Sequence, residues 1–265
     1  MRLDCDRTGD TVWRVCIEPG DADQAVIDRD GVIVLAGLLD DVEASGECRV
    51  LVLEGQEGSF CQGMDLSYLA AHPGEDVSGE THEYARCLDR MRRLRQVVIA
   101  VVDGSANGGG LGLAAAADVV VATARSTFGL PEVVLGLVPA IVLPVLLERM
   151  TSHHARLLAL SGSVEATKAA EMGLVDYVVA EPERLERKVR AVIKHGLRCN
   201  PISVAGVKKL SDDLDGLSRT AGLERGADLT AELIADSNRL ADIEGFLKGE
   251  PLPWFDRYRP PKGGR

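Results

Sequence analysis

Short apolar runs alternate with segments of helical periodicity through the first half of the chain. The apolar runs predict strands over residues 10–18, 49–53, 97–102 and 119–122. Around them, apolar residues recur every three to four positions and predict helices over residues 32–44, 65–69, 83–95 and 111–117. Strands that alternate with helices are typical of crossover units, so the pattern predicts an α/β fold with a mostly parallel sheet.

Helical patterns follow one another in the second half of the chain. They predict helices over residues 138–150, 152–160, 164–172, 182–195, 202–214 and 223–247. Residues 54–62 are expected to form a loop, and residues 103–110 a glycine-rich turn. We therefore expect an α/β core over residues 1–195, a helical region over 196–256, and a disordered tail over 257–265.

The charge and composition of the chain exclude several classes of partner. Its net charge of −11 disfavours nucleic acid and anionic membrane surfaces, since contacts with phosphates need lysine and arginine. No apolar run is long enough to span a bilayer and no signal peptide opens the chain, so we expect a soluble, cytoplasmic protein. The six cysteines are far apart and form no Cys-x-x-Cys pair, so we expect reduced thiols and no metal site.

Three successive glycines, Gly108, Gly109 and Gly110, lie between a predicted strand and a helix of small residues. Glycine lets the backbone approach a ligand closely and leaves N–H groups bare at the start of the helix. Such groups can hold a phosphate or donate to a developing oxyanion. The G-x-G-x-x-G spacing is absent and no lysine follows, which favours the oxyanion. A tight turn with close helix packing explains these glycines equally well.

Two further segments are candidates for chemistry. Residues 59–66 follow a strand and open a helix, so the N–H of Met64 is a second possible donor, while Asp65 suits a helix N-cap. Glu132 has apolar neighbours on both sides in sequence, which would raise the pKa of its carboxyl by desolvation and suit it to move a proton near neutral pH. The alternative for Glu132 is an exposed position in the first turn of a helix after Pro131.

The candidate segments around Met64, the three glycines and Glu132, in their order along the chain, resemble motifs of the enoyl-CoA hydratase/isomerase, or crotonase, superfamily. Its motifs are a Phe-x-x-Gly-x-Asp loop, a strand with a Gly-Gly-Gly turn, an Asp-x-x-x-x-Ala strand, a Phe-Gly-x-Pro-Glu-x-x-x-Gly segment and an A-x-x-A-x-x-x-G-L-V segment. They match residues 60–65, 97–110, 118–122, 128–136 and 166–175. The resemblance implies a crotonase (ClpP-like) fold, with a spiral core of repeated ββα units and a helical C-terminal lid and trimerisation region. A homotrimer or a dimer of trimers is then expected.

The resemblance also implies roles for individual residues. The backbone N–H groups of Met64 and Gly109 would form an oxyanion hole for a thioester enolate, and Glu132 would act as the acid/base. The substrate-binding residues would include Cys61, Gly63, Gly108 and Gly110. No separate cofactor is expected, because the acyl group arrives as a phosphopantetheine or CoA thioester.

Position 112 departs from the pattern of the hydratases. They carry a first glutamate two residues past the Gly-Gly-Gly turn, where this chain has Gly112. Two glutamates normally hold the attacking water, so the resemblance to simple hydratases is incomplete here. One glutamate suffices for a syn elimination or for migration of a double bond.

Residues 136–144 and 227–256 look like the dehydratases of polyketide β-branching cassettes. Those enzymes dehydrate 3-hydroxy-3-methylglutaryl groups on an acyl carrier protein to 3-methylglutaconyl groups, and a second crotonase homologue then decarboxylates the product. The resemblance implies the same reaction and the same two partners here. The alternative is an enoyl-CoA hydratase, isomerase or decarboxylase that acts on a free acyl-CoA. A homologue that only binds a partner is disfavoured by the intact glycine turn and Glu132.

A glutaryl substrate carries a second carboxylate that needs a donor. His82, Tyr84 and Arg86 are the candidates, and each is equally consistent with an ordinary surface residue. Arginines are dense in this part of the chain, at positions 86, 90, 92, 93 and 95. They could steer an acidic carrier protein or a phosphate, or they could pair with Glu83 and Asp89 on a solvated helix.

Overall fold

The computed structural model describes residues 1–7, 10–20, 22–56, 58–255 and 258. Its larger sheet has six strands in the order β1-β2-β3-β5-β7-β10. They are β1 (Arg2–Asp6), β2 (Val12–Glu18), β3 (Val50–Gly55), β5 (Val97–Val102), β7 (Val119–Thr123) and β10 (Tyr177–Val179). β1 is antiparallel to β2 and every other neighbouring pair is parallel, so the predicted mostly parallel sheet is confirmed.

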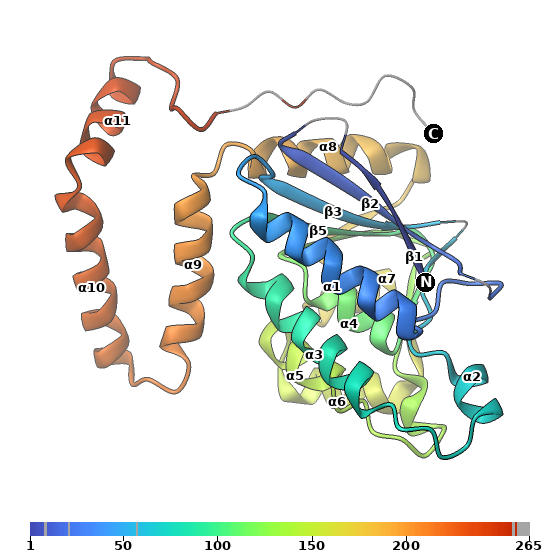
Figure 1. Ribbon diagram of the computed structural model, residues 1–265. Coiled ribbons are helices and arrows are strands. Elements are labelled where there is room, and N and C mark those ends of the chain that lie inside the picture. The colour runs from blue at the N-terminus through green and yellow to red at the C-terminus, as the bar shows by residue number, and fades with distance from the viewer. Residues whose placement is uncertain (8–9, 21, 57, 256–257, 259–265) are drawn as a thin grey trace.

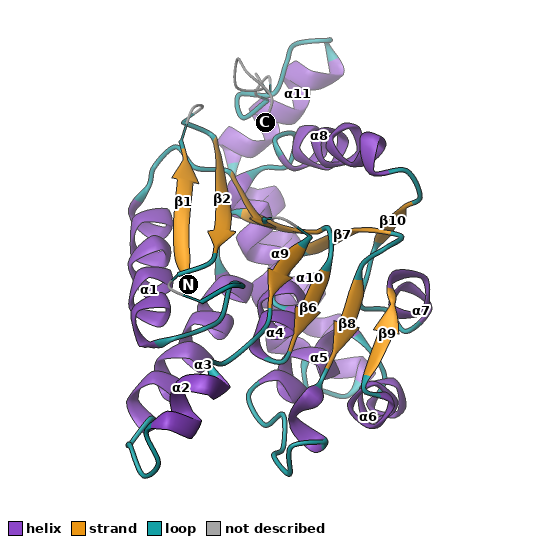
Figure 2. Ribbon diagram, turned by 90° about the vertical axis from the view of Figure 1, so that its right-hand side faces the viewer, coloured by secondary structure: helices purple, strands orange, loops and turns teal. Residues whose placement is uncertain are grey.

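A smaller sheet branches from the first (Figure 2). Its four strands are β4 (Ser59–Cys61), β6 (Ser105–Asn107), β8 (Thr127–Gly129) and β9 (Ser163–Glu165). β3 continues into β4, β5 into β6, and β7 into β8, and a helical segment follows each pair before the chain returns to the large sheet. This repeat confirms the predicted spiral of ββα units.

Glycines at two of the corners let the chain pass from one sheet to the other. Gly104, between β5 and β6, has φ +132°, and Gly58, before β4, has φ +77°. A Cβ at Gly104 would lie 1.6 Å from Gly58 O, so the two corners touch backbone to backbone. Any side chain at position 104 would separate the corners and, with them, β4 from β6.

The central strands are buried on both faces, which explains their unbroken apolar runs. One face packs against a group of helices (Figure 1): α1 (Arg29–Ala44), α3 (Ser78–Arg93), α4 (Gly109–Ala115), α5 (Val142–Arg149), α6 (Ser152–Ser161) and α7 (Ala166–Glu171). The other face packs against α8 (Leu185–Gly196) through Val189, Ile193 and the following Leu197. Alternate residues of each strand therefore enter opposite cores.

The C-terminal helices extend away from this core (Figure 1). They are α9 (Pro201–Leu214), α10 (Arg219–Ala235) and α11 (Ser237–Leu247). Lys208 ties α9 to the core, because its Nζ lies 2.6 Å from Asp118 Oδ2 and donates to Gln96 O over 2.9 Å. None of the three helices contains a buried residue, and Leu240, for example, is 46% exposed. The expected homotrimer or dimer of trimers stays a prediction, and the expected tail at 257–265 lies, except for Tyr258, outside the described residues.

Several predicted elements are wrong in detail. The expected helix over 223–247 is two helices, because Asp236 caps α11 with its side chain on the Asn238 N–H. The expected helix over 164–172 begins as strand β9, and the one over 138–150 begins only at Val142. β1 and β10 were not predicted, and β4 and β6 lie inside the expected loop and turn. A strand of three residues is too short to show an alternating pattern. In the described ranges, no helix has the length and apolar content needed to cross a bilayer.

Candidate active site

The loop after β4 directs one backbone N–H into the site. Ile27 holds this loop, because its N–H donates to Gly63 O over 2.7 Å and its carbonyl accepts the Asp65 N–H over 3.2 Å. The N–H of Met64 shares a trans peptide unit with Gly63 O and therefore points the opposite way, away from Ile27. Among the hydrogen bonds of the described residues, none uses this N–H. The Asp65 side chain accepts the Tyr68 N–H over 2.9 Å, so the predicted N-cap of α2 (Leu66–Ala71) is confirmed.

The glycine turn after β6 directs a second N–H. Gly108 adopts φ +50° and its carbonyl accepts the Gly112 N–H over 3.1 Å, which starts α4. The Gly109 N–H belongs to the same trans peptide unit as Gly108 O, so it points out of the first turn of the helix. Within the part of the chain that the structure describes, no hydrogen bond uses the Gly109 N–H.

These two segments approach each other because both carry glycines. Gly63 has φ +85°, and a Cβ there would lie 2.9 Å from Asn107 O and 3.0 Å from Gly109 N. A Cβ at Gly110 would lie 2.1 Å from Cys61 O. No side chain fits between the segments, so two unbonded N–H groups are held on neighbouring stretches of backbone. Such a pair can donate to one oxyanion.

The carboxylate of Glu132 lies against the glycine turn. The residue sits in the short helix η1 (Pro131–Val133) directly after β8, and its Oε1 is 3.0 Å from the position of a Cβ on Gly108. Its Oε2 is buried, with no hydrogen-bond partner among the described residues. Desolvation raises the pKa of the Glu132 carboxyl above its ordinary value, and a backbone hydrogen bond opposes this more weakly. A carboxyl in this setting can take up a proton from the substrate and return it.

The raised pKa of Glu132 has a consequence for stability. The folded state binds this proton more tightly than the unfolded state, so ionisation of Glu132 costs stability as the pH rises through its raised pKa. We expect Glu132→Gln to raise the Tm at pH 7. The gain should shrink as the pH falls towards about 4.3, the ordinary value for a glutamate. Calorimetry across this range tests the expectation, with the exposed Glu47→Gln as control. An equal gain at every pH would contradict it.

Other side chains pack closely around Gly112, which stands where the hydratases carry their first glutamate. A Cβ at Gly112 would lie 3.2 Å from Val142 Cγ2. It would also lie 3.4 Å from Leu88 Cδ1 and from the Tyr84 hydroxyl. The surroundings of position 112 are therefore close-packed and largely apolar, and a side chain there would require Val142 to shift by a few tenths of an ångström. Position 112 therefore supplies no acidic partner for Glu132.

The three candidate donors for a distal carboxylate have different surroundings. Tyr84 is only 5% exposed, and its hydroxyl donates to Gly109 O, so it supports the glycine turn through this carbonyl. Burial raises the pKa of Tyr84 well above its ordinary value, so the hydroxyl keeps its proton. His82 Nδ1 lies 2.6 Å from Ser78 O on the exposed side of α3, and Arg86 is paired with Glu83. Of the three, the structure brings only Tyr84 into contact with the turn.

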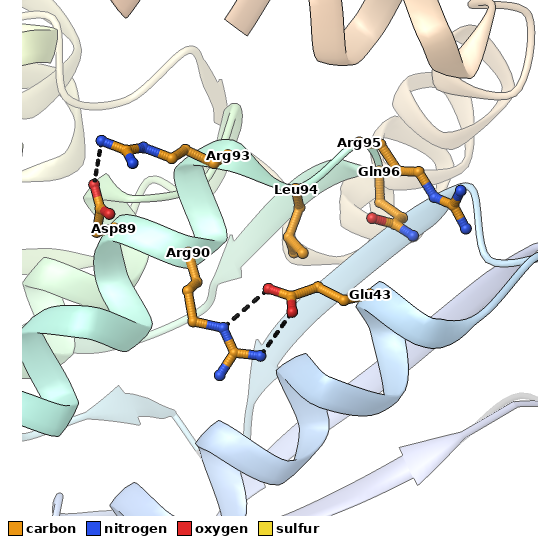
Figure 3. Close-up of a pocket in the computed structure, with 7 residues that line it drawn as sticks. All are labelled: Glu43, Asp89, Arg90, Arg93, Leu94, Arg95 and Gln96. Carbon is orange, nitrogen blue, oxygen red and sulfur yellow. Dashed lines mark hydrogen bonds and ion pairs between the residues drawn. The ribbon is translucent and has the colours of Figure 1, made fainter. Parts of the chain in front are cut away.

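The arginine-rich end of α3 lies beside a separate pocket of about 420 Å³ (Figure 3). Arg90 donates to Glu43 of α1 over 2.9 Å, and Arg93 pairs with Asp89. The remaining arginines also have partners: Arg86 has Glu83, Arg92 has Glu148 and Asp212, and Arg95 has Ser45 O. The expected pairing of this run with Glu83 and Asp89 is therefore observed, and its role in steering a carrier protein stays a prediction.

Cys61 contributes its backbone to the site. The residue is fully buried, and burial raises the pKa of its thiol to about 11, so the thiol is neutral near pH 7. Its carbonyl packs closely against Gly110, so the backbone of Cys61 limits the space beside the glycine turn. Within the described part of the chain, no group of three or more His, Cys, Asp or Glu residues is placed to hold a metal ion.

Sequence reasoning missed two polar residues of this site, Gln62 and Asn107. The Asn107 Nδ2 donates to Gln62 Oε1 over 2.7 Å, which joins the two loops that carry the unbonded N–H groups. Both residues are inside the quoted motifs, but they are 45 positions apart, and no local pattern shows that they meet.

Comparison with known proteins agrees with this geometry. A family model described as enoyl-CoA hydratase/isomerase matches residues 31–257. The 2,3-dehydroadipyl-CoA hydratase of Escherichia coli is 30% identical over 221 residues, which are 81% of this chain and 85% of the relative. The bacillaene synthase dehydratase PksH of Bacillus subtilis is 28% identical over 213 residues, which are 78% and 80%.

Solved structures show the same fold. The crystal structure of an enoyl-CoA hydratase/isomerase from Marinobacter aquaeolei superposes with a TM-score of 0.86 at 25% identity, covering 96% of this chain and 99% of that one. The mixed α/β fold, with helices at its C-terminus, therefore has its counterpart in a known fold. The chain belongs to the enoyl-CoA hydratase/isomerase family, in the crotonase superfamily, and is an enzyme of the hydratase and dehydratase type.

Proposed function

We propose that the protein dehydrates a 3-hydroxy-3-methylglutaryl thioester on an acyl carrier protein to the 3-methylglutaconyl thioester, as in polyketide β-branching. The observation that carries the proposal is the lone carboxylate beside the glycine turn. Glu132 lies against Gly108, while the surroundings of Gly112 are filled by Val142, Leu88 and Tyr84. A site with one carboxylate suits elimination of water better than activation of water between two carboxylates.

The proposed reaction uses these groups one after another. The thioester oxygen accepts hydrogen bonds from the N–H groups of Met64 and Gly109, which stabilise negative charge on that oxygen. Glu132 removes the proton from the α carbon, and the electron pair is delocalised into the enolate. The enolate then expels the β-hydroxyl, to which the now neutral Glu132 returns the same proton, so that water leaves and the carboxylate is restored. A raised pKa suits Glu132 to both proton transfers.

A relative and two segments of the chain support this choice of substrate. The bacillaene synthase dehydratase shares 28% identity with the chain. Residues 136–144 and 227–256 resemble the dehydratases of β-branching cassettes. An acyl carrier protein is then the partner that delivers the substrate, and a crotonase-type decarboxylase consumes the product. The acyl group would arrive on phosphopantetheine, with no separate cofactor, in the cytoplasm.

The alternative function is hydration, isomerisation or decarboxylation of a free acyl-CoA. The Escherichia coli 2,3-dehydroadipyl-CoA hydratase favours it, since its 30% identity slightly exceeds that of the dehydratase. Gly112 weighs against simple hydration, because a glycine at this position supplies no second carboxylate to help hold the water.

The test offers the same acyl group on two carriers. We expect 3-hydroxy-3-methylglutaryl-carrier protein to lose about 18 Da by intact mass, the mass of one water, as the elimination requires. The same group on CoA should react more slowly at equal concentration. Release of carbon dioxide from a glutaconyl-carrier substrate instead would assign the decarboxylase reaction. Hydration of crotonyl-CoA without either change would assign the alternative.

A further inference from the structure

The two segments that carry the oxyanion donors are bonded to different parts of the backbone. Residues 62–65 form backbone hydrogen bonds with the stretch 25–27, through Gln62 N to Ala25 O, Ile27 N to Gly63 O and Asp65 N to Ile27 O. The glycine turn is instead bonded to β8, where Gly108 N donates to Gly129 O over 2.9 Å. The pairing of β4 with β6 also carries a register shift between Ser59 and Cys61. Beyond the β4–β6 ladder, the backbone hydrogen bonds therefore tie each donor segment to a different part of the chain and not to the other segment.

A side-chain bridge joins the segments where the backbone does not. Asn107, two residues before Gly109, donates from Nδ2 to Gln62 Oε1 over 2.7 Å, and Gln62 lies two residues before Met64. Beyond the β4–β6 ladder, this is the hydrogen bond that links residues 62–65 to residues 107–110 in the described chain. Met64 thus follows one end of the bridge, and Gly109 the other, by two residues each.

The Gln62 amide is held by more than this bond. Its Nε2 donates to Ser59 Oγ over 2.8 Å and to Ser105 Oγ over 2.6 Å, while its Oε1 accepts from Asn107. Both amide hydrogens are used, and a rotated amide would set two NH₂ groups against each other. Asn107 is confined too, because its Oδ1 is 2.7 Å from the position of a Cβ on Gly129.

We infer that Gln62 and Asn107 are positioning residues that hold the Met64 and Gly109 N–H groups at the separation needed to share one oxyanion. The inference rests on the oxyanion hole of the proposed function. Neither side chain needs to touch the substrate, since each acts through the backbone two residues further on. A misplacement of about 1 Å in such a site can cost on the order of 100-fold in rate, because the hydrogen bonds tighten only as charge develops.

The test uses Gln62→Met, which keeps the length of the side chain, and Asn107→Ala. We expect kcat for the carrier-bound substrate to fall by roughly 10- to 100-fold while KM stays within about twofold, since the donors act on the enolate more than on the ground state. The double variant should be no slower than Gln62→Met, because both changes break the same bridge. Ser163→Ala on β9 of the same sheet is the matched control and should leave kcat unchanged.

Infrared spectroscopy separates positioning from general loosening of the fold. A thioester labelled with ¹³C at its carbonyl is bound to the protein in a Glu132→Gln background, which prevents turnover. The hole should lower the carbonyl stretching frequency, and both bridge variants should return it towards the value in water. Should one variant not fold, the other decides the result.

Folded bridge variants with kcat within twofold of wild type and an unchanged carbonyl band would overturn the inference. Failure of the proposed function gives a different result. If the wild-type protein does not dehydrate the glutaryl substrate, crotonyl-CoA is bound instead. Its carbonyl band, compared between the wild-type protein and the bridge variants, then decides the inference independently of the proposed function.

Discussion

Glu132→Gln is expected to lower kcat for dehydration by about 1,000-fold, within the range of 10² to 10⁴ typical of acid–base groups. The amide has nearly the size of the carboxylate but cannot accept the α proton, so both halves of the elimination lose their proton carrier. KM should change little, because the substitution keeps the shape of the site and removes a group that is needed for proton transfer rather than for binding. Initial rates followed by intact mass of the carrier-bound substrate measure both constants.

Two comparisons sharpen this experiment. Glu47→Gln, an exposed change on the loop after α1, should leave the rate unchanged. The pH profile of kcat/KM in the wild type should fall on the acid side with a midpoint above about 4.3, because the pKa of Glu132 is raised by desolvation and the base must be ionised to start. More than about a tenth of the wild-type rate in Glu132→Gln would assign the proton transfer to another group.

Gly110→Ala is expected to destabilise the protein by about 3 kcal/mol or more and to abolish activity. The added methyl would lie 2.1 Å from Cys61 O, 2.6 Å from Cys61 C and 2.7 Å from Cys61 Cβ. Two of these three atoms are backbone, so no rotamer change relieves the contact. The turn must move away from β4, which separates the two donor segments. Urea unfolding followed by far-ultraviolet circular dichroism measures the loss.

Gly37→Ala is the matched control for the glycine turn. Gly37 also lies in a helix, α1, but a Cβ there meets no atom within 4 Å. Alanine should leave stability unchanged or raise it by about 0.5–1 kcal/mol, since glycine is unfavourable inside a helix. If Gly110→Ala and Gly37→Ala unfold at the same urea concentration, the close packing of the turn on Cys61 does not limit stability.

The larger elements were predictable because their patterns are long. The runs at 97–102 and 119–122 are buried on both faces as β5 and β7, and the periodicity of residues 32–44 corresponds to α1. The order of the quoted motifs was sufficient to predict the crotonase fold. The strands β4, β6, β8 and β9 have three residues each, and that length carries no readable period. Their structure depends on pairing with segments distant in sequence.

The candidate site divides in the same way. The amino-acid pattern was sufficient to identify the candidates for the chemistry: the glycine turn, Met64, Glu132 and the absence of a glutamate at position 112. Local chemistry is sufficient there, because glycine lets the backbone approach a ligand closely and proton transfer needs an ionisable side chain.

The contacts that support these groups are visible only in the folded chain. Folding bonds the Tyr84 hydroxyl to the Gly109 carbonyl, packs Val142 beside Gly112, and joins Gln62 to Asn107 across 45 residues. The physical reason is that such contacts depend on the crossing of the two sheets and on the packing of α3 and α5 against α4. No periodicity along the chain records which side chains meet where separate strands end side by side.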